Sequence, residues 1–194
     1  DTHDGQFPLL AYHNNSRSAA NELDKSWLAT LKPFVENVDE VRFCPEDTEG
    51  VSGQIPNLTS FAMNGYLRER RQLDTSGLPP AVVEQMRRSS IGLVSDFNKL
   101  QKTHATILML EGTATQLGVN FDHVHSYEWF SEQNLVNREA PEFAVFSAVN
   151  SEVAVDRHLG GANYVYADGH VATISAADVA EWCRDGFNFA IPPQ

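Results

Sequence analysis

The hydrophobic pattern of the chain is clearest at residues 105–112, where ATILMLEG forms a nearly continuous apolar run ending on Glu111 and Gly112. A short apolar run without alternation is typical of a strand that is covered on both faces of its sheet. Residues 105–112 are therefore predicted to form a central strand, with Glu111 at its end.

A second pattern lies at residues 157–171, RHLGGANYVYADGHV, where apolar and polar positions alternate on either side of Asp168-Gly169. Alternation with a period of two indicates strands, and an Asp-Gly pair favours the type I′ turn, in which both central residues have positive φ. We expect a β-hairpin here. Residues 176–185 then predict a helix, with Ser175 as its N-cap and Gly186 as its C-cap.

The remaining segments have weaker patterns. We expect helices at 15–36 and near 81–88, strands at 41–47 and 58–67, a polar and aromatic loop at 121–130, and a helix or buried apolar segment at 140–155. Within the strand expected at 58–67, Asn64-Gly65 is expected to mark a turn or bulge with positive φ.

The order of these elements indicates the fold class. Strands and helices do not alternate regularly, which favours a single α+β domain over residues 1–194 with an antiparallel β-sheet. The polar span 68–102 predicts a long loop insertion on the surface. No apolar run approaches the roughly 18 residues that a membrane-spanning helix needs.

The charge of the chain restricts its partners. Fourteen Lys and Arg against 26 Asp and Glu give a formal net charge of −12 at pH 7. Because nucleic-acid binding requires cations that neutralise phosphates, the sequence predicts no nucleic-acid partner.

Two groups of histidines and acids are candidate metal sites, because imidazole with carboxylate suits zinc and carboxylates with carbonyls suit calcium. Neither group has a standard ligand spacing such as H-E-x-x-H. We therefore favour a structural role, in which His158 hydrogen-bonds and locks the loop that Gly160 and Gly161 allow to turn. The candidate ligands are His158 and His170 with Asp156 or Asp168, and His123 and His125 with Asp122 or Glu128.

Cys44 and Cys183 are the two cysteines of the chain, far apart and without a C-x-x-C spacing. They are candidates for a disulfide in an oxidising compartment, and two buried free thiols are the alternative. Ser, His and Asp occur without a G-x-S-x-G motif, and no Gly-rich phosphate loop is present, so no catalytic residues are assigned.

The string RHLGGANYVYADGHV resembles the C-terminal signature of the prepilin-type H-x9-DG proteins, since nine residues separate His158 from Asp168-Gly169. Other pieces occur in the family's order: DTHDGQFP resembles the end of its long N-terminal helix, and RFCPED its F-x-C-P-x-D element, followed by SFAMNGYL, ATILMLEG and SEVAVDRH. The resemblance covers nearly the whole chain, with the signature region at about 140–194.

The resemblance implies a pilin-like globular head with an antiparallel sheet, helices on one side and long loop insertions. It implies a non-catalytic subunit of a type IV pilus-like or type II secretion pseudopilus-like filament, located outside the cytoplasm at the periplasm or cell surface. The expected partners are other pilin-like subunits or secretion components, and the membrane through an N-terminal helix that precedes Asp1. Arg157, His158, Gly160, Gly161, Asp168 and Gly169 are the structural motif. No cofactor is expected, with calcium, which some related pseudopilins bind in a C-terminal loop, or zinc as the alternatives.

Two other classes of function stay open at this stage. The first is a metal-dependent extracytoplasmic binding module or enzyme that uses the histidine and aspartate groups named above. The second is a carbohydrate-binding module, in which Tyr127 and Trp129 serve as stacking platforms for sugar rings.

Overall fold

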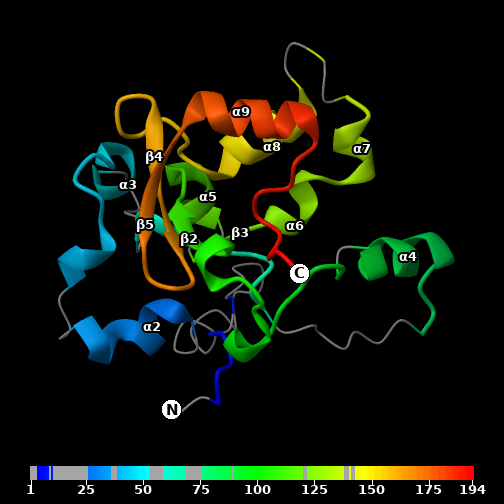
Figure 1. The fold of residues 1–194 in the computed structure, drawn as a ribbon, viewed down its shortest axis with the longest axis horizontal. Helices are drawn as coiled ribbons and strands as arrows, with labels where there is room; N and C mark the ends of the chain where they lie inside the picture. Colours follow the sequence, from blue (N-terminus) through cyan, green and yellow to red (C-terminus); the bar gives the residue numbers. More distant parts are fainter. Residues whose placement is uncertain are drawn as a thin grey trace.

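The chain folds around a five-stranded mixed sheet (Figure 1). The strand order is β3-β1-β2-β4-β5, so β2 is central, as the apolar run predicts. The strands are β1 Phe61–Asn64, β2 Ile107–Glu111, β3 His123–Val124, β4 Gly161–Tyr166 and β5 Val171–Ser175.

This architecture comes from a computed structural model of the chain. It describes residues 4–8, 10, 26–35, 39–52, 59–68, 76–88, 90–119, 122–137, 140 and 143–194. Most of the helix expected at 15–36 lies outside the described residues, and within its described part the chain is helical from Trp27 to Val35.

The sheet confirms the α+β class, although it is not purely antiparallel. β1 with β2, β2 with β4, and β4 with β5 pair antiparallel, whereas β3 runs parallel to β1. Parallel neighbours need a long crossover, and more than 50 residues separate β1 from β3 along the chain. The expectation of a wholly antiparallel sheet is therefore wrong at this one edge.

Helices cover both faces of the sheet, which corrects the expectation of helices on one side. Figure 1 shows α8 (Ala144–Glu152) and α9 (Ala176–Asp185) side by side at the top, and α2 (Trp27–Leu31) at the bottom. Val149 of α8 and Val179 of α9 belong to one cluster of buried apolar residues, the first core cluster, together with Ala62 of β1. Trp27 of α2 belongs to a second cluster with Met63, whose side chain points to the opposite face from that of Ala62.

The other helical segments are short and lie in the connections. None of the helices in the described part of the chain has the length and apolar character to cross a membrane. Their bounds are η1 Lys32–Val35, η2 Asp39–Arg42, α3 Thr48–Ser52, α4 Pro80–Arg88, η3 Phe97–Lys99, η4 Thr103–Ala105, α5 Ala114–Val119, α6 Ser126–Trp129 and α7 Glu132–Leu135.

The C-terminal hairpin and the helix after it match their predictions. Ser175 caps α9 by accepting a hydrogen bond from the Asp178 amide, and Gly186 ends the helix with a φ of 71°. The turn type is wrong, because Gly169 has a φ of 92° whereas Asp168 does not adopt positive φ. The Gly169 amide donates to Tyr166 O, and the Tyr166 amide donates to His170 O. This pattern is that of a type I turn followed by a bulge at glycine.

Three weaker predictions are corrected. Residues 41–47 form no strand, because η2 leads into a turn in which the Asp47 amide donates to Cys44 O, with Pro45 between them. Residue 58 of the strand expected at 58–67 lies outside the described residues, and within 59–67 the strand is limited to β1. The expected loop at 121–130 contains β3 and α6.

Candidate functional site

His158 lies beside the end of the central strand. The loop between α8 and β4 turns through two residues with positive φ, Leu159 at 54° and Gly160 at 92°, and the His158 amide donates to Gly161 O. This conformation places His158 Nε2 2.8 Å from Oε1 of Glu111. Of the two glycines that were expected to let the loop turn, only Gly160 adopts positive φ. At Gly161, an added Cβ would lie 2.9 Å from the carbonyl oxygen of Ile174.

Glu111 is the acceptor at the centre of the site, and its side chain is 1% exposed. In addition to its contact with His158, its Oε2 accepts a hydrogen bond of 2.8 Å from the Asn163 amide of β4. Both carboxylate oxygens therefore have a donor, which is the usual requirement for burying such a group. Glu111 connects the end of β2 to the start of the C-terminal hairpin.

Arg157 continues the network toward β1 and α3. Its Nη2 donates to Gly112 O at 2.8 Å and lies 3.3 Å from Oδ1 of Asp47, and its Nη1 lies 3.3 Å from Ser60 O and 4.0 Å from Glu111 Oε1. The Arg157 side chain is 7% exposed. A buried guanidinium that reaches two carbonyls and two carboxylates fixes the relative positions of the segments that carry them.

Cys44 completes the group. Its Sγ lies 3.5 Å from His158 Nε2. Burial raises the pKa of the Cys44 thiol, and Glu111 adds to the rise, so the thiol is protonated at neutral pH. Cys44 and Asp47 both belong to RFCPED, and Arg157 and His158 belong to the C-terminal signature. The two sequence motifs therefore meet in one network, which we call the 44–158 cluster: Cys44, Asp47, Glu111, Arg157 and His158.

The other candidate ligands in the C-terminal region lie elsewhere. β4 has six residues, which at about 3.3 Å per residue separate its ends by roughly 17 Å. His158 is at one end, and Asp168 and His170 form their own pair at the other, with His170 Nδ1 2.6 Å from Asp168 Oδ1. Asp156 is exposed in the turn before β4. The structure therefore does not bring His158, His170, Asp156 and Asp168 into one site.

His123 and His125 lie close together, with ring centroids 5.2 Å apart, but each has its own carboxylate. His123 Nδ1 lies 2.6 Å from Oδ1 of Asp122, and both side chains are buried. His125 Nδ1 lies 2.9 Å from Oε1 of Glu152 in α8. Glu128, the other expected ligand, is exposed on α6.

Within the part of the chain that the structure describes, one group brings three candidate ligand atoms within 4.8 Å of one another. It consists of Cys44, Glu111 and His158. Of these, the metal prediction included His158 alone. The missed signal is Glu111, a carboxylate at the end of a central apolar strand, where a charge needs buried partners.

The cysteine pair is not a disulfide. Both thiols are free and buried, Cys44 beside His158 and Cys183 in α9 among the apolar side chains of the first core cluster. Burial raises the pKa of Cys183 to about 12, so it behaves as a small apolar residue.

The carbohydrate hypothesis loses one of its two aromatic residues. Trp129 is 1% exposed, packs at 5.8 Å from the Phe189 ring centroid, and donates through Nε1 to Glu152 Oε2. It is a core residue and cannot stack on a sugar. Tyr127 is half-buried, with the Arg68 guanidinium 4.0 Å above its ring.

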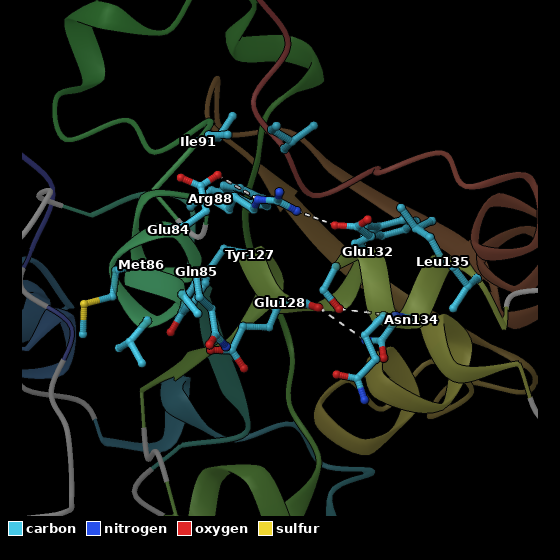
Figure 2. Close-up of a pocket in the computed structure, with 18 residues that line it drawn as sticks. Glu84, Gln85, Met86, Arg88, Ile91, Tyr127, Glu128, Glu132, Asn134 and Leu135 are labelled. Carbon is cyan, nitrogen blue, oxygen red and sulfur yellow. Dashed lines mark hydrogen bonds and ion pairs between the residues drawn. The ribbon is translucent and has the colours of Figure 1, made fainter. Parts of the chain in front are cut away.

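A groove lies between α4 and the α6–α7 segment (Figure 2). Arg88 of α4 pairs with Glu132 of α7 across it, and Arg88 also pairs with Glu84 on its own helix. No residue of α4 is buried, and exposed ion pairs contribute little to stability. The ion pairs that line the α4 side of the groove are therefore exposed to solvent and do not by themselves define a ligand site.

The pair of His125 and Glu152 predicts a pH dependence of stability. The carboxylate of Glu152 raises the pKa of His125 above its usual 6.5, against an opposing effect of burial. The charged pair is therefore fully formed below about pH 6.5, and its stabilising contribution is lost as the pH rises through the higher folded-state pKa. We expect the free energy of unfolding to decline over this range, measured by urea denaturation from about pH 6 to pH 8.

The variant His125→Gln is expected to flatten that decline, whereas His104→Gln, which changes an exposed histidine, keeps it. An equal pH slope in the wild type and His125→Gln would show that the pair does not titrate as described.

We compared the chain with models of protein families, with curated proteins and with solved structures, and no match was found.

Proposed function

We propose that the chain is the globular head of a pilin-like or pseudopilin-like subunit, with a structural, non-catalytic role in a filament at the cell envelope, outside the cytoplasm. The observation that carries the proposal is the use of the signature residues. Arg157 and Glu111 are buried, and with His158 and Asp47 they connect β1, β2, β4 and the turn before α3. Residues used in this way hold a fold together rather than act on a substrate.

The position of the two motifs gives further support. RFCPED and the C-terminal signature are more than 100 residues apart, yet Cys44 contacts His158 and Asp47 contacts Arg157. In the resemblance to the H-x9-DG proteins they are separate elements, and their contact here supports reading them as parts of one structural unit. Subunit contacts would then fall on the outer surface, which carries exposed apolar side chains such as Leu159, Val136 and Phe187.

The proposal is tested in the native cells, with the complete gene product. Cys44 and Cys183 are buried, so a single introduced surface cysteine is the preferred target of a cross-linker with one thiol-reactive and one amine-reactive end, which joins that cysteine to an amine of a neighbouring subunit. We expect Leu159→Cys or Val136→Cys protein to fractionate with the envelope and to give a ladder of cross-linked products that contain further pilin-like subunits. The wild-type protein is the control without an exposed thiol. Recovery of the protein in the cytoplasm, with no cross-linked products from either variant, would refute the proposal.

A further inference from the structure

Three side chains of the 44–158 cluster point their ligand atoms at one small region. Cys44 Sγ lies 3.5 Å from His158 Nε2, and His158 Nε2 lies 2.8 Å from Glu111 Oε1. A tetrahedral zinc ion has Zn–S distances of about 2.3 Å and Zn–N and Zn–O distances of about 2.0–2.2 Å, which place its ligand atoms roughly 3.3–3.6 Å apart. The sulfur–nitrogen separation already fits this spacing. The nitrogen–oxygen separation needs to open by about 0.6 Å, which His158 can provide because its side chain is 28% exposed.

The donor types favour a transition metal over calcium. A thiolate and an imidazole are soft and borderline ligands that suit zinc, whereas calcium requires six or more oxygen ligands. Cys44, His158 and Glu111 supply one sulfur, one nitrogen and one carboxylate. Three protein ligands leave a fourth position for water, and the partly exposed His158 lies on the side from which solvent reaches the cluster.

The charged groups of the cluster also favour a cation. Two buried carboxyl groups, those of Asp47 and Glu111, share one guanidinium, that of Arg157, at 3.3 Å and 4.0 Å. A divalent metal would add positive charge beside Glu111, the carboxyl group that lies farther from Arg157.

The segments that carry the ligands are held in place before any metal binds. Glu111 ends the central strand, and its Oε2 is fixed by the Asn163 amide. The turn that contains Cys44 is closed by the Asp47 amide, and the His158 backbone is fixed by its hydrogen bond to Gly161. Such preorganisation lowers the cost of gathering ligands.

We propose that Cys44, Glu111 and His158 bind one divalent transition metal of the zinc class, with water as the fourth ligand. On binding, the Cys44 thiol releases its proton and His158 coordinates through Nε2 while its ring proton moves to Nδ1. The metal would tie the turn at 44–47 to the end of β2 and to the loop before β4. The proposal goes beyond the filament role and does not depend on it.

The test begins with protein from which metal has been removed by chelator and dialysis. Zn²⁺ is expected to bind at one ion per chain, measured by elemental analysis, and to raise the melting temperature. Co²⁺ is expected to give the absorption of a tetrahedral site with a thiolate-to-cobalt charge-transfer band. Ca²⁺ is the negative control and is expected to leave the melting temperature unchanged. Absence of a thiolate band together with no zinc retention would overturn the proposal, as would stabilisation by calcium alone.

The two cysteines supply a matched pair of variants. Cys44→Ser is expected to abolish the cobalt thiolate band and to weaken zinc binding by more than about 100-fold. Cys183→Ser removes the other buried thiol, which packs among apolar side chains, and is expected to keep both. Loss of the band in Cys183→Ser with its retention in Cys44→Ser would overturn the assignment. If Cys44→Ser fails to fold, the spectra of the wild type and Cys183→Ser, with zinc binding by His158→Asn, decide the question.

Discussion

Replacement of Arg157 by methionine is expected to lower the free energy of unfolding by about 3–5 kcal/mol, the range found when one partner of a buried ion pair is removed. The methionine side chain is unbranched and apolar, so it occupies part of the space of the arginine side chain but carries no charge and no hydrogen-bond donor. Asp47, whose side chain is 3% exposed, would lose its cation, and the carbonyl oxygens of Ser60 and Gly112 would each lose a hydrogen bond.

The measurement is urea denaturation in the presence of chelator, so that bound metal does not contribute. Arg157→Lys retains the charge without the planar fork and is expected to fall between methionine and the wild type. Arg88→Met is the matched control, because Arg88 makes its ion pairs on the surface, and its stability should be close to that of the wild type. A loss below about 1 kcal/mol in Arg157→Met would mean that the network is not a structural cross-link.

The predictions from sequence succeeded where local rules decide the structure. The end of the chain, with β4, β5 and α9, follows from alternation, an Asp-Gly turn and a capping serine, all of which act between near neighbours. Even there the turn type was wrong, because the backbone at Asp168 keeps negative φ and Gly169 alone adopts positive φ. In a type I′ turn, Asp168 and Gly169 would be the two central residues. In the observed type I turn the central residues are Ala167 and Asp168, and Gly169 follows them as the bulge.

The 44–158 cluster could not be predicted in the same way. Its members come from segments that are far apart along the chain, and no pattern in one sequence states that Cys44 lies beside His158. Glu111 was visible as the end of an apolar strand, but its donors, the Asn163 amide and His158, depend on how β4 pairs with β2. A hydrophobic pattern identifies the strand, whereas tertiary pairing identifies the site.

Asn64-Gly65 shows a related limit. The turn was expected, and the Leu67 amide does donate to Asn64 O. Positive φ was not needed, because Gly65 is not among the residues that adopt it; a Cβ there would lie 2.3 Å from Val124 O, so the glycine provides space for β3. Asn64 is buried, and its Nδ2 donates to Ile107 O and Ala190 O. A residue pair that signals a turn can thus be selected for packing.

Replacement of Glu111 by alanine should be as costly as the loss of Arg157, at about 3–5 kcal/mol, because it leaves buried donors without an acceptor. The Asn163 amide and His158 Nε2 would both lose their oxygen, and the volume of the side chain would become a cavity. Glu111→Gln preserves the volume and one acceptor, so its expected loss is smaller, about 1–3 kcal/mol.

These two variants are both neutral and differ in side-chain volume and in one acceptor oxygen, and both are measured in chelator by urea denaturation. Glu181→Ala, on the exposed side of α9, is the control for removal of a carboxylate and should leave stability unchanged. Equal losses for alanine and glutamine would assign the effect to what both variants lack, namely the negative charge of Glu111, 4.0 Å from Arg157, and its second acceptor oxygen. A much smaller loss for glutamine would instead assign most of it to the hydrogen bonds that hold the hairpin against β2, which is the outcome that the 1% exposure of Glu111 and its two close donors predict.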